Sequence, residues 1–171
     1  PLRKEGLSKF AGVLCPHGHS KEGRLAEYTQ ARCASLARMG AVVFAYDMVG
    51  WNDDSNHVHH RKDKNVFAFQ TWNSMRALDY LLTFREVDPT RIGVTGESGG
   101  GNLSLATAIK AKRDGTLDQI DGIYAQCPYI SNLWADPSPQ LASLVENDGY
   151  FLNVSEMGAL ANVYDPDGHN A

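Results

Sequence analysis

Short apolar runs alternate in this chain with segments whose apolar residues recur at helical spacing. Four runs predict buried strands, and they cover Ala11–Cys15, Ala41–Tyr46, Arg91–Thr95 and Ile120–Gln126. The second run is continuous rather than alternating, as in strands of a parallel sheet that is covered on both faces. The pattern therefore favours a parallel sheet in the core.

Helices are predicted between these strands. The apolar residues on one face of the first helix are Leu25, Tyr28, Leu36 and Met39, and those of the second are Trp72, Met75, Leu78 and Leu82. Gly40 follows the first helix, Asp88–Pro89 ends the second, and a third is predicted over Asn102–Arg113. Strands and helices thus alternate, which predicts an α/β fold in three layers, a mostly parallel sheet with helices on both sides.

The length of 171 residues fits a single domain over residues 1–171. We expect a sheet core over residues 1–127 and an irregular, helical tail over residues 128–171. Residues 47–65 are rich in Gly, Asn, Asp and His, so we expect a long loop there. No convincing strand pattern follows residue 127, and the sheet is expected to stop early.

A glycine-rich motif, Gly96-Glu97-Ser98-Gly99-Gly100, lies between the third predicted strand and the third predicted helix. It has the form G-x-S-x-G, and a strand–turn–helix context identifies such a motif as a nucleophile elbow. Glycine is needed at its first and last positions because side chains there would crowd the sharp turn. We expect Ser98 to be a nucleophile at the carboxyl end of the sheet, with the N–H of Gly99 facing a developing oxyanion.

The same glycines do not fit a phosphate-binding loop. A Walker loop needs Gly-Lys-Ser/Thr after its glycines, whereas this chain has Gly100-Gly101-Asn102. A dinucleotide fingerprint needs G-x-G-x-x-G at the first strand, and Gly99, Gly101 and Ser104 do not match it. The motif therefore favours nucleophilic chemistry, and no cofactor is expected.

A second feature follows the first predicted strand, where the sequence reads Pro16-His17-Gly18-His19. In a nucleophile-elbow fold, the loop at this place supplies the other oxyanion donor. Glycine in that loop lets the backbone approach a substrate closely. We therefore predict an oxyanion hole built from His17, Gly18, His19 and Gly99.

Two families resemble different parts of the chain. The chain resembles α/β-hydrolases of the acetyl xylan esterase and dienelactone-hydrolase-like type over three segments, Val87–Gly100, Cys15–His19 and Met39–Asp47. From Gly96 onward the chain resembles esterases of the hormone-sensitive-lipase family, over the segments Gly96–Leu103, Ala125–Ile130 and Glu146–Leu152. The lipase-like esterases carry His-Gly-Gly-Gly where this chain has His17-Gly18-His19-Ser20. The resemblances imply an α/β-hydrolase-like core lacking the usual last strands, of hybrid or truncated origin.

The catalytic acid and base follow from chain order alone. An α/β-hydrolase triad runs Ser, then Asp or Glu, then His, and His169 is the only histidine after Ser98 in the sequence. Chain order thus assigns the base to His169 and the acid to Asp165. Since a triad is defined by geometry, alternatives stay open: Asp136, Asp148 and Asp167 for the acid, and His17, His19, His57, His59 and His60 for the base.

The cluster His57-Val58-His59-His60 also has the ligand chemistry of a transition-metal site. No carboxylate or cysteine joins it at a fixed spacing. A solvated polar loop is therefore the preferred interpretation, and no metal is expected.

Composition and charge narrow the function classes. The net charge of −4 carries no electrostatic signature of nucleic-acid binding. The sequence has no run of about 18 apolar residues, so no membrane span is expected, and no apolar leader opens the chain. Cys15, Cys33 and Cys127 are widely spaced and odd in number, which favours buried thiols in a reducing, cytoplasmic compartment.

Two functions from different classes fit these observations. The first is a serine carboxylic-ester hydrolase that acts on a small-molecule ester through an acyl-enzyme on Ser98. The second is a truncated, catalytically inactive core that acts as a binding or assembly module. In both cases, a sheet that stops early leaves an unpaired apolar edge, so we expect a homo-oligomer.

Overall fold

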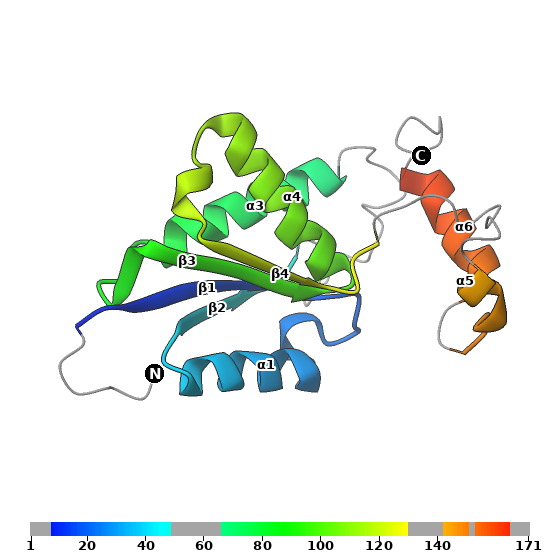
Figure 1. Cartoon of the computed structure of the whole chain (residues 1–171), viewed down its shortest axis with the longest axis horizontal. Helices are drawn as coiled ribbons and strands as arrows, with labels where there is room; N and C mark the ends of the chain where they lie inside the picture. The colour runs from blue at the N-terminus through cyan, green and yellow to red at the C-terminus, as the bar shows by residue number, and fades with distance from the viewer. Residues whose placement is uncertain (1–7, 49–65, 130–141, 151–152, 165–171) are drawn as a thin grey trace. The chain divides into compact units, whose positions relative to one another are not determined.

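The computed structural model of the chain describes residues 8–48, 66–129, 142–150 and 153–164. The chain divides into two compact units, residues 1–129 and residues 130–171. The first unit holds the sheet and the second holds two short helices (Figure 1). The second unit begins at residue 130, close to residue 128, where the tail is predicted to begin.

Four parallel strands form the sheet of the first unit, in the order β2–β1–β3–β4. They are β1 (Phe10–Pro16), β2 (Val42–Tyr46), β3 (Val87–Glu97) and β4 (Gly122–Gln126). β1 pairs with β2 and with β3, and β3 pairs with β4, all in parallel. The carboxyl ends of all four strands therefore meet at one edge of the sheet, where Ser98 follows β3.

Helices cover both faces of this sheet (Figure 1). α1 (Glu27–Arg38) lies on one face, and α3 (Val66–Leu81) and α4 (Gly99–Asp114) lie on the other. Two single-turn 3-10 helices, η1 (Gly23–Leu25) and η2 (Leu117–Gln119), precede α1 and β4. The three layers confirm the predicted α/β architecture with a parallel sheet.

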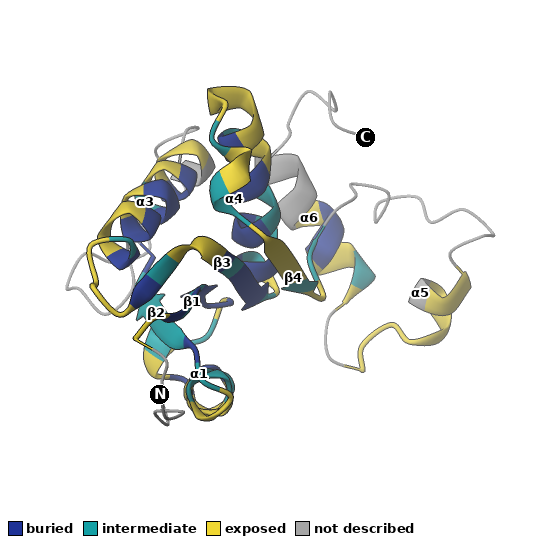
Figure 2. Cartoon of the chain, turned by 60° about the vertical axis from the view of Figure 1, so that its left-hand side comes forward, coloured by how far each residue is buried: buried dark blue, intermediate teal, exposed yellow. Residues whose placement is uncertain are grey.

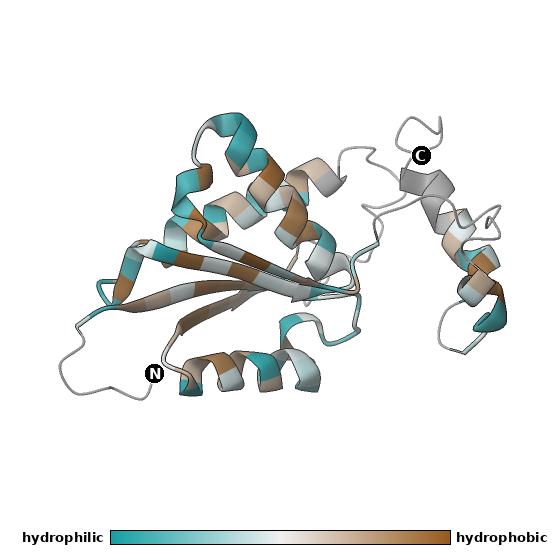
Figure 3. Ribbon diagram, in the orientation of Figure 1, coloured by the Kyte–Doolittle hydropathy of each residue, from teal (hydrophilic) through white to brown (hydrophobic). Residues whose placement is uncertain are grey.

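The main apolar core lies between the sheet and α3. Its buried side chains come from β1, α3 and β3, and they are Leu14, Ala77, Leu78, Leu81, Val87, Ile92 and Val94. Figure 2 shows the buried residues in dark blue, and Figure 3 shows that the strands carry much of the apolar character. Apolar burial stabilises by about 25 cal/mol per Å², so this layer holds the sheet and its helices together.

β3 is longer than the sequence predicts. It begins at Val87 and runs through Pro89, where the sequence predicts a break. Its pairing with β1 shifts register here, and residues 89–91 are left without partners on β1. The N–H and the hydroxyl of Thr90 both donate to the Asp88 carboxylate, at 3.0 and 2.7 Å. A proline is accepted at such a bulge because it has no N–H to contribute to the ladder.

The α1 helix forms as predicted, but the prediction of its buried face is wrong for three of its four residues. Leu25, Tyr28 and Met39 are exposed. The residues that turn inward, buried or half-buried, are Thr29, Arg32, Cys33 and Leu36. Two of them, Thr29 and Arg32, are polar, because this face of α1 meets the carboxylate of Glu97 at the end of β3.

The apolar face of α3 is predicted more closely. Met75 and Leu78 are buried, and Leu82, just beyond the helix, is partly buried against the core. Trp72 is the exception, because it is exposed and stacks on the ring of Phe69. The position of Trp72 at helical spacing therefore does not place it in the core.

The second unit holds α5 (Ala142–Glu146) and α6 (Val154–Tyr164). Gly149 turns the chain between them with a φ of 79°, a conformation that favours glycine. The carboxylate of Asp148 accepts the N–H of Val154 at 2.7 Å, in the first turn of α6. The irregular, helical tail over residues 128–171 stays a prediction, because only part of it lies within the described residues.

β4 forms one edge of the sheet within the described residues, and its Ile123 and Tyr124 are exposed. None of the helices seen in the described residues has the length and apolar character that a membrane crossing requires. Residues 49–65, most of the predicted long loop, lie outside the described residues.

Candidate active site

Ser98 is the single residue between β3 and α4. Its backbone has φ 51° and ψ −122°, and a positive φ is uncommon for a residue other than glycine. Such a conformation costs about 1–3 kcal/mol and persists only where the surroundings hold it. The Ser98 N–H donates to the carbonyl of Gln126 at 2.9 Å, and the Asn102 N–H donates to the carbonyl of Ser98 at 3.1 Å. The turn is thus held from both sides, and Ser98 is exposed at the carboxyl edge of the sheet.

Gly96 and Gly100 make this turn possible. A Cβ atom at Gly96 would lie 2.5 Å from the carbonyl oxygen of Gly100. A Cβ atom at Gly100 would lie 2.4 Å from the carbonyl oxygen of Pro16. Both contacts are with backbone atoms, which cannot give way without disturbing β1 or the turn. The prediction that side chains at these two positions would crowd the turn is confirmed.

The loop after β1 packs directly against the turn. A Cβ atom at Gly18 would lie 3.2 Å from the Cβ of Ser98 and 2.9 Å from the carbonyl oxygen of Glu97. The imidazole of His19 lies over Gly99, where an added Cβ would be 2.7 Å from Nδ1 of the ring. The fold therefore brings together the two segments that the sequence predicts at one site.

Glu97, the residue before Ser98, joins three parts of the fold through its carboxylate. Oε1 accepts the N–H of Gly18 at 2.8 Å and the hydroxyl of Thr29 at 3.3 Å. Oε2 pairs with the guanidinium of Arg32 on α1. Only 14% of the Glu97 side chain and 17% of the Arg32 side chain are exposed. Because a buried charge needs a partner, these contacts tie α1 and the loop after β1 to the end of β3.

His17 is buried, and both of its ring nitrogens have partners. Nδ1 donates to the carbonyl of Gly18 at 2.7 Å, and Nε2 accepts the N–H of Met48 at 3.1 Å. This pattern needs a neutral ring that carries its proton on Nδ1. Burial lowers the pKa of His17 below its ordinary value, which also favours the neutral ring. His17 therefore connects the loop after β1 to the residues after β2, and these contacts argue against it as the base for Ser98.

The segment after β4 anchors the turn from the other side. The side-chain amide of Asn102 donates to the carbonyl of Tyr129 and accepts its N–H, both at 2.6 Å. Asn102 lies in the first turn of α4, directly after the turn at Ser98. Together with the bond from Ser98 to Gln126, this pair fixes the start of α4 against the end of β4.

Other predicted residues do not join this cluster. Seven of the predicted residues lie outside the described part of the chain: His57, His59, His60, Asp136, Asp165, Asp167 and His169. Asp148 belongs to the second unit, at the start of α6. Within the described residues, no group of three or more His, Cys, Asp or Glu side chains could hold a metal ion. The described cluster is thus Ser98, Gly99 and the loop from His17 to His19.

Three further residues of the site, Glu97, Thr29 and Arg32, are missing from the sequence prediction. Glu97 occupies one of the variable positions of the G-x-S-x-G motif, and the motif alone predicts no role for a residue there. A carboxylate at the end of a buried strand needs hydrogen-bond donors. This requirement could have predicted a role for Thr29 and Arg32. Thr29 and Arg32 are three residues apart on α1 and so share one helical face.

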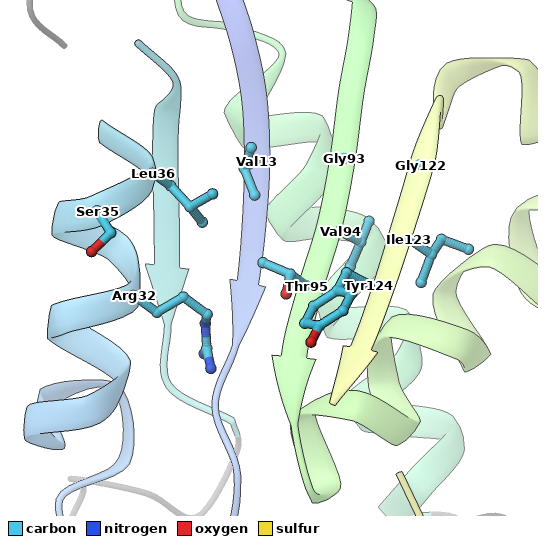
Figure 4. Close-up of a pocket in the computed structure, with 10 residues that line it drawn as sticks. All are labelled: Val13, Arg32, Ser35, Leu36, Gly93, Val94, Thr95, Gly122, Ile123 and Tyr124. Carbon is cyan, nitrogen blue, oxygen red and sulfur yellow. The ribbon is translucent and has the colours of Figure 1, made fainter. Parts of the chain in front are cut away.

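A separate groove lies on the α1 side of the sheet (Figure 4). It has a volume of about 510 Å³, and its lining residues come from β1, α1, β3 and β4. Most of them are apolar, such as Val13, Leu36 and Ile123. Ser98 is not among the lining residues, so this groove belongs to the sheet face rather than to the turn.

Comparisons with known proteins agree with this fold. A family model described as alpha/beta hydrolase fold matches residues 64–171. A brefeldin A esterase, described as a bacterial homologue of human hormone sensitive lipase, is 33% identical with a TM-score of 0.66, and the match covers 98% of this chain and 46% of that one. The methylesterase BT1017 is 32% identical with a TM-score of 0.58, over 73% of this chain and 27% of that one. The esterase Est22 is 26% identical with a TM-score of 0.59, over 93% and 47%.

The chain belongs to the α/β-hydrolase family, because the family model matches more than half of it. The resemblance to esterases of the hormone-sensitive-lipase family is confirmed by the match to brefeldin A esterase. The chain spans less than half the length of these three solved structures. The resemblance of the part before Gly96 to acetyl xylan esterases stays a prediction.

The buried, neutral state of His17 predicts a pH-dependent stability. Its folded pKa lies below the ordinary value of about 6.5. The contribution of neutral His17 to the free energy of unfolding is therefore fully present above that pH, and it is lost as the pH falls through the folded pKa. Between about pH 7 and about pH 5, the free energy of unfolding should fall less in His17→Gln than in the wild type. Urea unfolding followed by circular dichroism measures both values, and equal falls in the two proteins would contradict a buried neutral His17.

Proposed function

We propose that this chain is a serine carboxylic-ester hydrolase that forms an acyl-enzyme on Ser98. One observation carries the proposal, the φ of 51° at Ser98 in the sharp turn between β3 and α4. In α/β-hydrolases, a serine in this strand–turn–helix arrangement is the nucleophile elbow. The similarity to a brefeldin A esterase, a methylesterase and the esterase Est22 supports a small-molecule ester as the substrate.

In this mechanism the hydroxyl of Ser98 attacks the ester carbonyl, the alcohol leaves, and water hydrolyses the acyl-enzyme. Negative charge develops on the carbonyl oxygen and is stabilised by backbone N–H groups. Gly99 is the first residue of α4. The N–H groups of a first helical turn have no acceptor within the helix and lie at the positive end of its dipole, so Gly99 is one oxyanion donor.

The loop from His17 to His19 forms the other side of the oxyanion hole. The N–H of Gly18 donates to Glu97, so the role of Gly18 is to let the loop approach Ser98 rather than to bind the oxyanion. His17 holds the loop in place from its buried position. The backbone N–H of His19, beside Gly99, is the donor that we assign to this loop.

A histidine takes the proton of Ser98 and returns it to the leaving alcohol. Chain order assigns this role to His169, with Asp165 as the acid that orients it. His19 is the alternative that the described geometry favours, because its ring lies against Gly99 next to Ser98. The contacts of both nitrogens of His17 make it the weaker candidate.

Ester turnover separates this function from that of an inactive core that serves as a binding or assembly module. Ser98→Ala should lower the hydrolysis of p-nitrophenyl acetate by a factor of at least about 10³, because the nucleophile is lost. Ser35→Ala, at an exposed position on α1, is the matched control and should keep full activity. A fluorophosphonate probe followed by peptide mapping should place the label on Ser98. Equal turnover in Ser98→Ala and the wild type would leave only the inactive core. A label on another serine would show that Ser98 is not the nucleophile.

We also propose that the chain self-associates through β4. This strand lies at the edge of the described sheet, and its exposed Ile123 and Tyr124 border the apolar groove. An unpaired strand edge with apolar side chains recruits other chains. A closed two-fold dimer is the commonest arrangement for such an edge.

Light scattering coupled to size exclusion tests this association. We expect a mass of about twice that of one chain at micromolar concentration. Tyr124→Lys should shift the protein to the mass of one chain, because a charge on an edge strand blocks edge-to-edge pairing. Tyr150→Lys, at an exposed position in the second unit, is the control and should leave the mass unchanged. A wild type that runs as a single species with the mass of one chain would refute the proposal.

A further inference from the structure

Cys15 on β1 and Cys33 on α1 lie on the same side of the sheet. Val13 on β1 lines the groove beside α1 together with Arg32 and Leu36 (Figure 4). Side chains alternate along a strand, so Cys15, two residues after Val13, points to the same face of the sheet. Leu14, between them, packs in the core with α3 on the opposite face. The strand therefore directs Cys15 toward α1.

Cys33 approaches Cys15 from the inward face of α1. It follows Arg32 directly and lies one turn after Thr29, and both of these neighbours bind Glu97. The thiols of Cys33 and Cys15 are close enough for each to shift the pKa of the other. Cys15 is fully buried, Cys33 is half-buried, and neither forms a disulfide. The two thiols and the guanidinium of Arg32 thus form one cluster.

We propose that Cys33 and Cys15 form a redox-active thiol pair, in which Cys33 reacts with hydrogen peroxide and Cys15 then closes a disulfide. Cys33 is the member of the pair with access to solvent, because it is half-buried whereas Cys15 is fully buried. In a reducing compartment such as the cytoplasm the pair rests in its dithiol form. Formation of this disulfide is a property of the chain that does not involve Ser98.

The oxidation takes two steps. The thiolate of Cys33 attacks one oxygen of hydrogen peroxide, the O–O bond breaks, and Cys33 becomes a sulfenic acid while hydroxide leaves and takes up a proton. The thiol of Cys15 then loses its proton and attacks the sulfur of Cys33, the S–O bond breaks, and water leaves. The two thiols together lose two electrons, and one peroxide is reduced to two molecules of water.

The surroundings of the two thiols support these roles. The contact with Cys15 lowers the pKa of Cys33, and the charge of Arg32 lowers it as well. The contact with Cys33 and burial both raise the pKa of Cys15. Because the thiolate is the reactive form of a cysteine, peroxide attacks Cys33 first. The guanidinium of Arg32 also interacts with Cys15 and lowers the pKa of that thiol, but the contact with Cys33 and burial outweigh this effect.

Closure of the disulfide would also act on the site around Ser98. An S–S bond is about 2.05 Å long, shorter than any hydrogen-bonded contact between two sulfurs, so oxidation draws α1 toward β1. Arg32 moves with Cys33, and Arg32 holds the carboxylate of Glu97 that binds the loop after β1. A loss of ester turnover on oxidation therefore rests on the proposed function, whereas the disulfide itself does not.

The test uses the full chain with Cys127→Ser, which removes the exposed third cysteine. After treatment with hydrogen peroxide, tryptic peptides mapped without reduction should contain a Cys15–Cys33 disulfide that dithiothreitol reverses. In Cys33→Ser, loss of the remaining thiol should be at least about tenfold slower, because the reactive thiolate is gone. In Cys15→Ala, oxidation should stop at a sulfenic acid on Cys33, which dimedone traps.

Circular dichroism verifies that each variant folds. If Cys15→Ala does not fold, the oxidation rate of Cys33→Ser, whose substitution is at a half-buried position, tests the proposal. Two free thiols after peroxide treatment would overturn the proposal, and so would equally fast oxidation of Cys15 in Cys33→Ser. Ester turnover of the untreated protein is measured in parallel. If the disulfide forms in a chain that hydrolyses no ester, the thiol pair stands and the proposed function fails.

Discussion

The largely buried carboxylate of Glu97 is the group on which the arrangement around Ser98 depends. It accepts the N–H of Gly18 and the hydroxyl of Thr29, and it pairs with Arg32. A buried ion pair adds little net stability over apolar residues of similar size, but removing one partner costs about 3–5 kcal/mol because the other charge is left alone. The carboxylate is therefore satisfied in one arrangement only, with α1 and the loop after β1 both docked on the end of β3.

The same constraint explains features that lie far apart in the chain. The inward face of α1 carries the polar Thr29 and Arg32 because it supplies donors to Glu97, and Cys33 follows Arg32 on this face. The positive φ of Ser98 is supported on one side by this docked loop and on the other by the carbonyl of Gln126. Strain at a functional residue persists where contacts on several sides enforce it, and here the contacts come from β1, α1 and β4.

The order of strands and helices could be predicted because apolar periodicity and turn residues are local properties of the sequence. The turn at Ser98 could be predicted for the same reason, since Gly96 and Gly100 leave a local signal. The inward face of α1 could not, because its polar residues are explained only by Glu97, which is 65 residues from Arg32 in the chain. His169 and Asp165 follow from chain order alone and lie outside the described residues.

The free energy of unfolding of Glu97→Gln tests this account most directly. The amide keeps nearly the same shape but leaves the guanidinium of Arg32 buried without a counter-charge, so the free energy of unfolding in urea should fall by about 3 kcal/mol. Glu86→Gln, which neutralises an exposed glutamate just before β3, is the matched control and should change it by less than about 0.5 kcal/mol. If Glu97→Gln unfolds at the same urea concentration as Glu86→Gln, the carboxylate of Glu97 does not hold this site together.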